Sequence, residues 1–141
     1  MFLTDKCATG NIVHELGHTI GFRHEQNRPD RDKYVQISAN IMDLDSTDPD
    51  RKNYNFFEDL EPGNYGVPYD LSSIMHYSDL DIAAVDSKLS FLMGQRDRLS
   101  FFDKKIVNRA YKCAGMNFDW LKFYFFEKFN SESCFKKIVD K

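Results

Sequence analysis

Three histidines within residues 14–24 constrain this chain more than any other feature of its sequence. The stretch reads HELGHTIGFRH and places His14 and His18 four positions apart. On a helix with 3.6 residues per turn, this spacing sets the two imidazoles about 40° apart and one turn along the same face. Their Cβ atoms then lie roughly 5 to 6 Å apart, so both rings reach one metal ion at about 2.0 to 2.1 Å.

Gly21 is expected to end the helix, because a residue without a Cβ adopts the left-handed conformation that turns the chain away from the helix axis. We expect this turn to return His24 to the same ion. Three neutral imidazoles, with no cysteine or carboxylate completing the set, leave a coordination position for water, as catalytic zinc sites do. The sequence therefore predicts a zinc site formed by His14, His18 and His24.

Glu15 follows His14 and lies about 100° round the helix, near enough to the metal for a bound water but poorly placed to be a third ligand. In HExxH sites this glutamate is the general base of a metal-dependent peptidase, and the extended HExxHxxGxxH spacing is more specific. The helix is predicted over residues 8–20, with Thr9 or Asn11 as its N-cap. Opposite the histidines we expect an apolar stripe that packs against the core, formed by Ile12, Val13, Leu16 and Ile20.

A second motif, SIMHY at residues 73–77, contains His76, the last of the four histidines in the chain. Every histidine therefore lies in one of the two motifs. A buried methionine in a loop usually fills a gap in the core, so Met75 alone would indicate no function. Its spacing after the third histidine of the first motif is what indicates one.

The segments between the motifs predict short elements. Residues 34–37 alternate in polarity as a strand does, and residues 38–41 are expected to start a single helical turn. The charged residues 25–32 are interpreted either as a solvated loop or as a loop whose charges fix its shape beside the metal. The acidic residues 43–50 lack the Gly and Glu positions of an EF-hand calcium loop, so they predict a polar surface loop.

The C-terminal third predicts a loop at residues 94–98 and a helix after it. Ser100 with Asp103 forms a capping-box pattern at the start of this helix. The helix is expected to run to about Lys112, with one apolar face formed by Ile106, Val107, Ala110 and Tyr111. Residues 114–141 are rich in aromatic side chains that do not line a single helix face.

Composition excludes several classes of function. The net charge is −3 and no basic tract is present, so nucleic-acid binding has no support. No stretch approaches the roughly 18 apolar residues of a membrane span, and residues 1–6 lack the apolar core and cleavage site of a secretory signal. Three cysteines permit at most one internal disulfide; they are Cys7, Cys113 and Cys134. Nothing in the sequence indicates an oligomeric state.

The two motifs resemble those of the astacin family of zinc metalloendopeptidases, which belongs to the metzincins. The distinguishing feature is Glu25 directly after the third histidine, followed by QNRPDRD at residues 26–32. The sequences GQR at residues 94–96 and AYKC at residues 110–113 are similar to the end of an astacin domain. The resemblance extends over roughly residues 7–113.

The resemblance implies a role for each matched residue. His14, His18 and His24 would bind Zn²⁺, and Glu15 would deprotonate the attacking water and pass the proton to the leaving amine. Tyr77 would be a displaceable further ligand that swings away to stabilise the oxyanion, although a packing role for Tyr77 stays open. Met75 would form a floor under the metal without binding it. The implied substrate is a protein or peptide, and the implied location is extracellular.

The same resemblance implies an α+β fold of the metzincin type, dominated by helices in this chain. Residues 1–113 would form a partial catalytic domain without most of its upper sheet subdomain, and residues 114–141 a tail of unknown role. The family's disulfides would join Cys7 and Cys113 to upstream cysteines that this sequence does not contain. Glu25 would contact the N-terminus freed when a pro-segment is removed, so we expect an uncompensated charge at this position.

Three interpretations of the function follow. The first is a secreted zinc endopeptidase, and the second is an inactive zinc-binding fragment that acts as an interaction protein. The third is a small extracellular module whose tail binds acidic or aromatic partners. Arg96 or Arg98 would favour acidic residues after the scissile bond, but a solvated loop is the simpler interpretation of these two residues.

Overall fold

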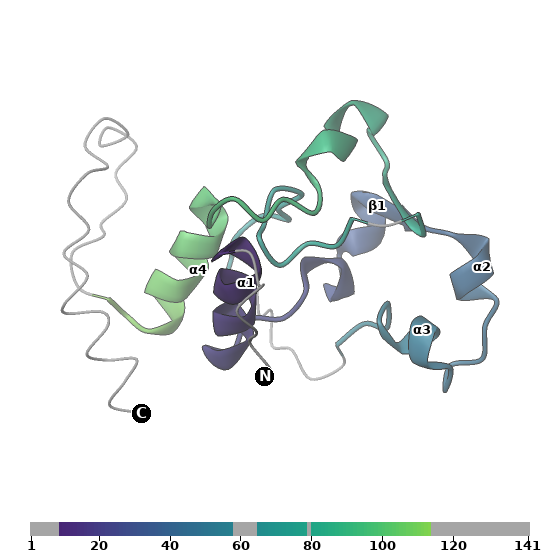
Figure 1. Ribbon diagram of the computed structural model, residues 1–141, viewed down its shortest axis with the longest axis horizontal. Coiled ribbons are helices and arrows are strands. Elements are labelled where there is room, and N and C mark those ends of the chain that lie inside the picture. Colours follow the sequence, from purple (N-terminus) through teal and green to yellow (C-terminus); the bar gives the residue numbers. More distant parts are fainter. Residues whose placement is uncertain (1–8, 58–64, 79, 114–141) are drawn as a thin grey trace.

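The computed structural model describes residues 9–57, 65–78 and 80–113 of the 141-residue chain. Two helices, α1 (Thr9–Thr19) and α4 (Phe101–Ala110), are drawn in one part of Figure 1, and a small sheet and two short helices are drawn away from them. The hydroxyl of Tyr111, just past α4, donates to the carbonyl of Ile20, just past α1, at 3.0 Å. The described part is rich in helix with little sheet, in agreement with the α+β prediction.

The end of α1 follows from its sequence. Gly21 has φ +92°, a left-handed conformation that favours glycine. Its N–H donates to the carbonyl of His18 at 3.0 Å, and the N–H of Phe22 donates to the carbonyl of Gly17 at 2.9 Å. This pair of bonds is a Schellman motif, which satisfies carbonyls that the helix leaves without intrahelical partners. The predicted stop at Gly21 is confirmed.

Two other helix boundaries differ from their predictions. Thr9, the first described residue, and Asn11 both lie inside α1, so neither residue is its N-cap. α4 ends at Ala110, two residues before the predicted end, and Lys112 already has φ +50°. The N-cap prediction was wrong, whereas the end of α4 agrees with the prediction within the one or two residues by which assignments of a helix end differ.

The buried face of α1 also differs from the prediction. Leu16 is 48% exposed, whereas Ile12, Val13 and Ile20 are partly buried, so the apolar stripe is only partly covered. A Cβ on Gly10 would lie 1.4 Å from the carbonyl oxygen of Arg96, and one on Gly17 would lie 2.8 Å from the sulfur of Met75. Close approach at the two glycines therefore determines which face is covered. The buried residues of this helix are Gly10, His14 and Gly17.

A two-stranded antiparallel sheet anchors the other part of the described chain. Strand β1 (Val35–Ile37) pairs with β2 (Ile82–Ala84), with Val35 opposite Ala84. The helix α2 (Ala39–Met42) follows Ser38, whose hydroxyl donates to the carboxylate of Asp81 at 2.6 Å. The predicted strand and helical turn are confirmed. The buried cluster around the sheet consists of Val35, Ile41, Tyr54, Tyr69, Ile82, Ala84 and Met93.

Most of the charged segment after His24 is buried, although Pro29 and Asp32 are exposed. This burial decides between the two interpretations of the segment. It forms two 3-10 helices, η1 (Glu25–Asn27) and η2 (Arg31–Lys33). Arg31 is 1% exposed; its guanidinium donates to the carbonyls of Gln26 and Tyr54. These bonds replace hydration of the guanidinium, so its charge fixes the loop from within. The interpretation as a solvated loop was wrong.

Residues 43–48 form the predicted surface loop, and residues 49–50 belong to the helix α3 (Pro49–Lys52), which was not predicted. The carboxylate of Asp45 accepts bonds from the N–H and hydroxyl of Thr47. Asp48 caps α3 by accepting a bond from the N–H of Asp50 at 2.9 Å. The acidic side chains therefore shape turns and a helix end.

The predicted loop at residues 94–98 and the predicted capping box are confirmed. The loop follows the 3-10 helix η3 (Ser87–Leu92). Gly94, with φ +73°, lies against Ser78. The hydroxyl of Ser100 accepts a bond from the N–H of Asp103 at 2.9 Å, and the carboxylate of Asp103 accepts one from the N–H of Ser100 at 2.8 Å.

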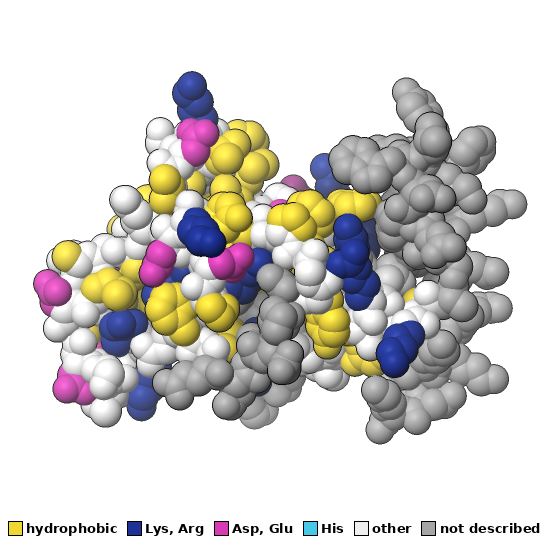
Figure 2. All heavy atoms as spheres, turned by 180° about the vertical axis from the view of Figure 1, so that it is seen from behind, with side chains coloured by type: hydrophobic (Ala, Val, Ile, Leu, Met, Phe, Trp, Pro, Cys, Tyr) yellow, Lys and Arg dark blue, Asp and Glu magenta, His cyan; other side chains and the backbone are white. Residues whose placement is uncertain are grey.

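Hydrophobic, basic and acidic side chains are interspersed over the face drawn in Figure 2. Leu80 and Phe91 are among the most exposed large hydrophobic residues. Within the described ranges, no helix is long and apolar enough to cross a membrane. Cys113 is disulfide-bonded, although this sequence does not contain the upstream partner that the family resemblance implies for it. Cys7, Cys134 and the whole segment 114–141 lie outside the described residues.

Candidate metal centre

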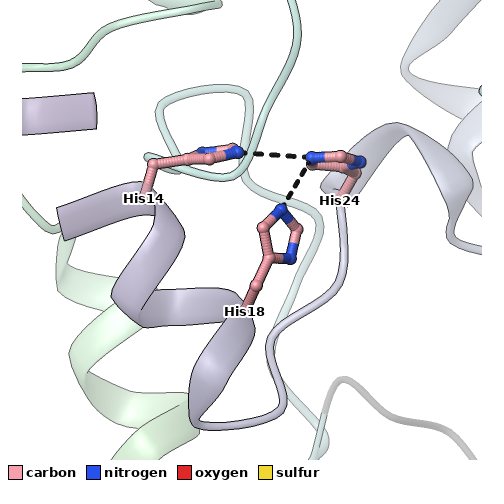
Figure 3. A group of neighbouring side chains, drawn as sticks. All are labelled: His14, His18 and His24. Carbon is pink, nitrogen blue, oxygen red and sulfur yellow. Dashed lines mark hydrogen bonds between the residues drawn. The ribbon is translucent and has the colours of Figure 1, made fainter. Parts of the chain in front are cut away.

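The three predicted histidine ligands come together in space. His14 and His18 project from α1, and His24 follows the turn at Gly21 (Figure 3). The Nε2 atom of His24 lies 3.1 Å from Nε2 of His18 and 3.3 Å from Nε2 of His14. One nitrogen from each ring lies within 4.8 Å of the others, which makes the cluster a candidate metal site.

Backbone carbonyls set the tautomer of the two helical histidines. Nδ1 of His14 lies 2.7 Å from the carbonyl oxygen of Ile74, and Nδ1 of His18 lies 3.0 Å from that of Phe22. Because a carbonyl only accepts, each Nδ1 carries the proton. In the neutral ring, each Nε2 is therefore an unprotonated lone pair that faces the other rings. Metal-binding histidines commonly have this arrangement, because the bond at the far nitrogen orients the ring.

The separations of the His24 nitrogen from the other two nitrogens fit a bound zinc ion. Two ligand nitrogens at about 2.0 to 2.1 Å from a tetrahedral zinc are about 3.3 Å apart, close to the observed 3.1 and 3.3 Å. Facing lone pairs at this distance repel one another unless a cation or proton lies between them. The chemistry of the three nitrogens therefore fits Zn²⁺, and no acidic or sulfur ligand is needed to bring them together.

Burial keeps the imidazoles of His14 and His24 in the form that binds metal. Burial, together with the smaller effects of the neighbouring rings of His18 and His14, lowers the pKa of His24 to about 3. The pKa of His14 is also lowered, mainly by burial and against its bond to Ile74. Neutral imidazole is the ligand form, so these rings do not have to lose a proton at neutral pH.

Glu15 and Tyr77 both lie beside the histidine cluster. Glu15 is partly buried on α1, directly after His14, and its charge acts on the pKa values of His14 and Arg96. The ring centroid of Tyr77 is 4.5 Å from that of His24. The structure thus brings together the three histidines and both residues for which the sequence predicts a catalytic role.

The backbone of Tyr77 is held on both sides. Its N–H donates to Oε1 of Gln26 at 3.2 Å, and its carbonyl accepts a bond from Nδ1 of His76 at 2.7 Å. Nε2 of His76 then accepts a bond from the hydroxyl of Tyr69 at 2.8 Å. His76 is fully buried. Its role is therefore to support the chain around Tyr77, which the sequence did not indicate.

Met75 packs directly against α1, at the turn between the two helical histidines. It is 2% exposed, and the close contact of its sulfur with Gly17 fixes it against the helix. Its carbonyl also accepts a bond from the N–H of Glu25 at 3.2 Å. Residues 73–77 are thereby tied both to the helix and to the segment that follows His24.

The expectation of an uncompensated charge at Glu25 was wrong. Its carboxylate accepts bonds from Arg28 at 2.9 Å and from the N–H of Asp70 at 2.8 Å. Burial nevertheless raises the pKa of Glu25 to about 7, against the effect of Arg28. The guanidinium three residues along the chain supplies the compensation, a local pairing that the sequence analysis missed.

Arg96 and Arg98 differ in their surroundings. Arg96 is partly buried and donates to the carbonyl of His76 at 3.2 Å, so it supports residues 73–77 from the loop at 94–98. Arg98 is exposed. The solvated-loop interpretation therefore holds for Arg98 and not for Arg96.

Comparison with known proteins identifies the family. Residues 1–112 match the family model described as Astacin, a family of peptidases. The chain belongs to the astacin family. The resemblance drawn from the two histidine motifs is thereby confirmed.

Relatives of this astacin chain include zinc metalloproteinases. It is 39% identical over 113 residues to zinc metalloproteinase nas-30 of Caenorhabditis elegans, covering 72% of this chain and 14% of that protein. It is 40% identical over 116 residues to nematocyst expressed protein 6 of Nematostella vectensis, covering 77% and 39% respectively.

A solved structure supports the same fold. High choriolytic enzyme 1, a hatching enzyme zinc-protease from Oryzias latipes, superposes with a TM-score of 0.60 at 34% identity. The match covers 74% of this chain and 52% of that one. The chain therefore spans about half of this neighbour and a smaller share of the relatives above.

Proposed function

We propose that this chain carries the zinc-binding half of a metalloendopeptidase that hydrolyses peptide bonds in proteins or peptides. The observation that carries the proposal is the convergence of three Nε2 atoms, at 3.1 and 3.3 Å, from His14, His18 and His24. The family membership supports a peptidase. By the same relationship we propose that the complete protein is secreted.

In this proposal each neighbouring side chain has a distinct role. Zinc, when bound, lowers the pKa of water toward about 7 and polarises the substrate carbonyl. Glu15 takes the proton of the attacking water and delivers it to the leaving amine, since it lies beside His14 without being needed as a ligand. The hydroxyl of Tyr77 donates to the oxyanion that develops on the carbonyl, and before that it is a displaceable ligand.

Residues 73–77 support the three histidines and Tyr77. Met75 forms the floor under the histidines through its contact with Gly17. Gln26 and His76 fix the backbone of Tyr77, which limits the movement of its side chain to rotation about its own bonds. Buried residues therefore hold the side chains that would bind the metal, deprotonate the water and stabilise the oxyanion.

The test is cleavage of an unstructured protein by the zinc-loaded chain, with and without a chelator. The Glu15→Gln variant keeps the three imidazoles and loses the base, so we expect it to bind zinc as the wild type does and to lose cleavage. Zinc bound by both proteins with cleavage by neither would favour the alternative of an inactive zinc-binding fragment. Equal cleavage by both would remove Glu15 from the mechanism.

A further inference from the structure

The carboxylate of Asp103 is bonded more extensively than a helix cap requires. It belongs to α4 and is 2% exposed. One oxygen accepts a bond from the hydroxyl of Ser73 at 2.7 Å. The other accepts bonds from the N–H of Ile74 at 3.0 Å and from the N–H of Ser100 at 2.8 Å. A capping box accounts only for the bond from Ser100.

The two additional bonds lead to the metal centre. Ile74 is fully buried, and its N–H donates to Asp103 while its carbonyl accepts the proton on Nδ1 of His14 at 2.7 Å. The position of that carbonyl sets both the tautomer and the orientation of the His14 ring. The carboxylate of Asp103 is thus connected to His14 through Ile74 alone, although Asp103 lies 89 positions further along the chain than His14.

Because Ile74 is buried, its N–H group depends on the carboxylate of Asp103 as an acceptor. An N–H group of Ile74 without its acceptor would be left unpaired in the interior, and such a group costs more than an exposed one. The segment would therefore shift to satisfy it, and the carbonyl that orients His14 would shift with it. The hydroxyl of Ser73 links Asp103 to the same segment a second time. It donates to Asp103 and accepts a bond from the N–H of Met75 at 3.0 Å.

We propose that Asp103 is a positioning residue for the zinc site, which it supports by fixing Ile74 and through it the ring of His14. The inference rests on the proposed zinc function. Groups that orient a metal-binding histidine from outside the coordination sphere typically affect metal affinity by about 10- to 100-fold. A residue that only capped α4 would alter stability and leave the affinity for zinc unchanged.

Two variants separate capping from positioning. Asp103→Glu keeps a capping box, because glutamate is a preferred residue at that position, but its longer side chain displaces the acceptor from Ile74. Ser100→Ala is the matched control: it removes the hydroxyl that caps α4, together with the bond of that hydroxyl to Asp70, and leaves the bonds from Ile74 and Ser73 to Asp103 in place. Asp103→Asn retains one oxygen that accepts from Ile74, so it is expected to preserve most of the affinity.

The measurement is zinc affinity of the full chain, by competition with a chromophoric chelator. We expect Asp103→Glu to bind zinc about 10-fold or more weakly than the wild type, and Ser100→Ala and Asp103→Asn to remain within a few-fold. The NMR resonance of the His14 Nδ1 proton in the metal-free chain provides a second readout. It should be observable in the wild type and in Ser100→Ala, and should broaden or disappear in Asp103→Glu as the bond to Ile74 weakens.

The outcomes distinguish the inference from the function on which it rests. A wild type that binds no zinc would overturn both. Two outcomes would overturn only the positioning role. In the first, the wild type and Asp103→Glu bind zinc with equal affinity. In the second, Asp103→Glu and Ser100→Ala lose affinity to the same extent. If Asp103→Glu does not fold, Ser73→Ala replaces it. This variant removes one bond to Asp103 and keeps the bond from the N–H of Ile74, but it also removes the acceptor of the N–H of Met75. Affinity equal to that of Ser100→Ala would then contradict the inference.

Discussion

The contact between α1 and the loop at residues 94–98 makes a sharp prediction for Gly10→Ala. Alanine in a helix is favoured over glycine by up to about 1 kcal/mol, so helix propensity alone predicts a more stable protein. The structure predicts the opposite. A Cβ at this position would lie 1.4 Å from the carbonyl oxygen of Arg96, where ordinary contact begins at 3.4 Å.

The magnitude follows from what has to move. The helix and the loop would have to separate by about 2 Å, to reach ordinary van der Waals distance. Overpacking that flexible side chains absorb costs typically about 1 to 3 kcal/mol, and here the obstacle is backbone. We therefore expect a cost of about 3 kcal/mol or more, and a net loss of at least about 2 kcal/mol after the gain in helix propensity.

The assay is urea denaturation of the full chain, with Asn11→Ala as the matched control. Asn11 is exposed on the same turn of α1, so its replacement changes propensity without creating a contact and should be neutral or slightly stabilising. Gly10→Ala should lower the free energy of unfolding by at least about 2 kcal/mol. A Gly10→Ala variant as stable as the wild type would refute the close packing of α1 on residue 96.

Three further predictions concern the turn and the metal. Gly21→Ala meets no atom within 4 Å but forces φ +92° on alanine, so it should lower the unfolding free energy by about 1 to 2 kcal/mol; an unchanged urea midpoint would contradict this. His24→Ala leaves two ligands on one helix, and we expect zinc to be lost on dialysis; a retained full equivalent, measured by atomic absorption, would exclude His24 as a ligand. Zinc at about 100 times its Kd should stabilise the chain by about 2.7 kcal/mol, so a chelator should lower the Tm, and a Tm insensitive to metal would contradict binding to the folded state.

Features set by neighbouring residues were predictable from the sequence. The spacing of His14 and His18, the stop at Gly21 and the Ser100–Asp103 capping box each depend on a single turn of helix. Local geometry fixes such features before any tertiary contact forms. The fold family was predictable for the same reason, because its motifs lie in short continuous stretches.

Features that depend on contacts between distant segments were not predictable. Gly10 and Gly17 were not assigned to the buried face of α1, because a hydrophobic pattern gives no weight to a residue whose contribution is the absence of a Cβ. The bond between Asp103 and Ile74 spans 29 positions. The sequence left open whether the charges of residues 25–32 are solvated or fix the loop, because a charged side chain such as Arg31 gives no sign in the sequence that backbone carbonyls will surround it.

Zinc K-edge X-ray absorption spectroscopy of the loaded chain tests the central claim most directly. The claim is that three imidazole nitrogens form the metal site. The spectrum should contain three such nitrogens at about 2.0 to 2.1 Å together with scattering from a water or tyrosine oxygen, and no sulfur. A sulfur shell at about 2.3 Å, or fewer than three imidazoles, would contradict the account.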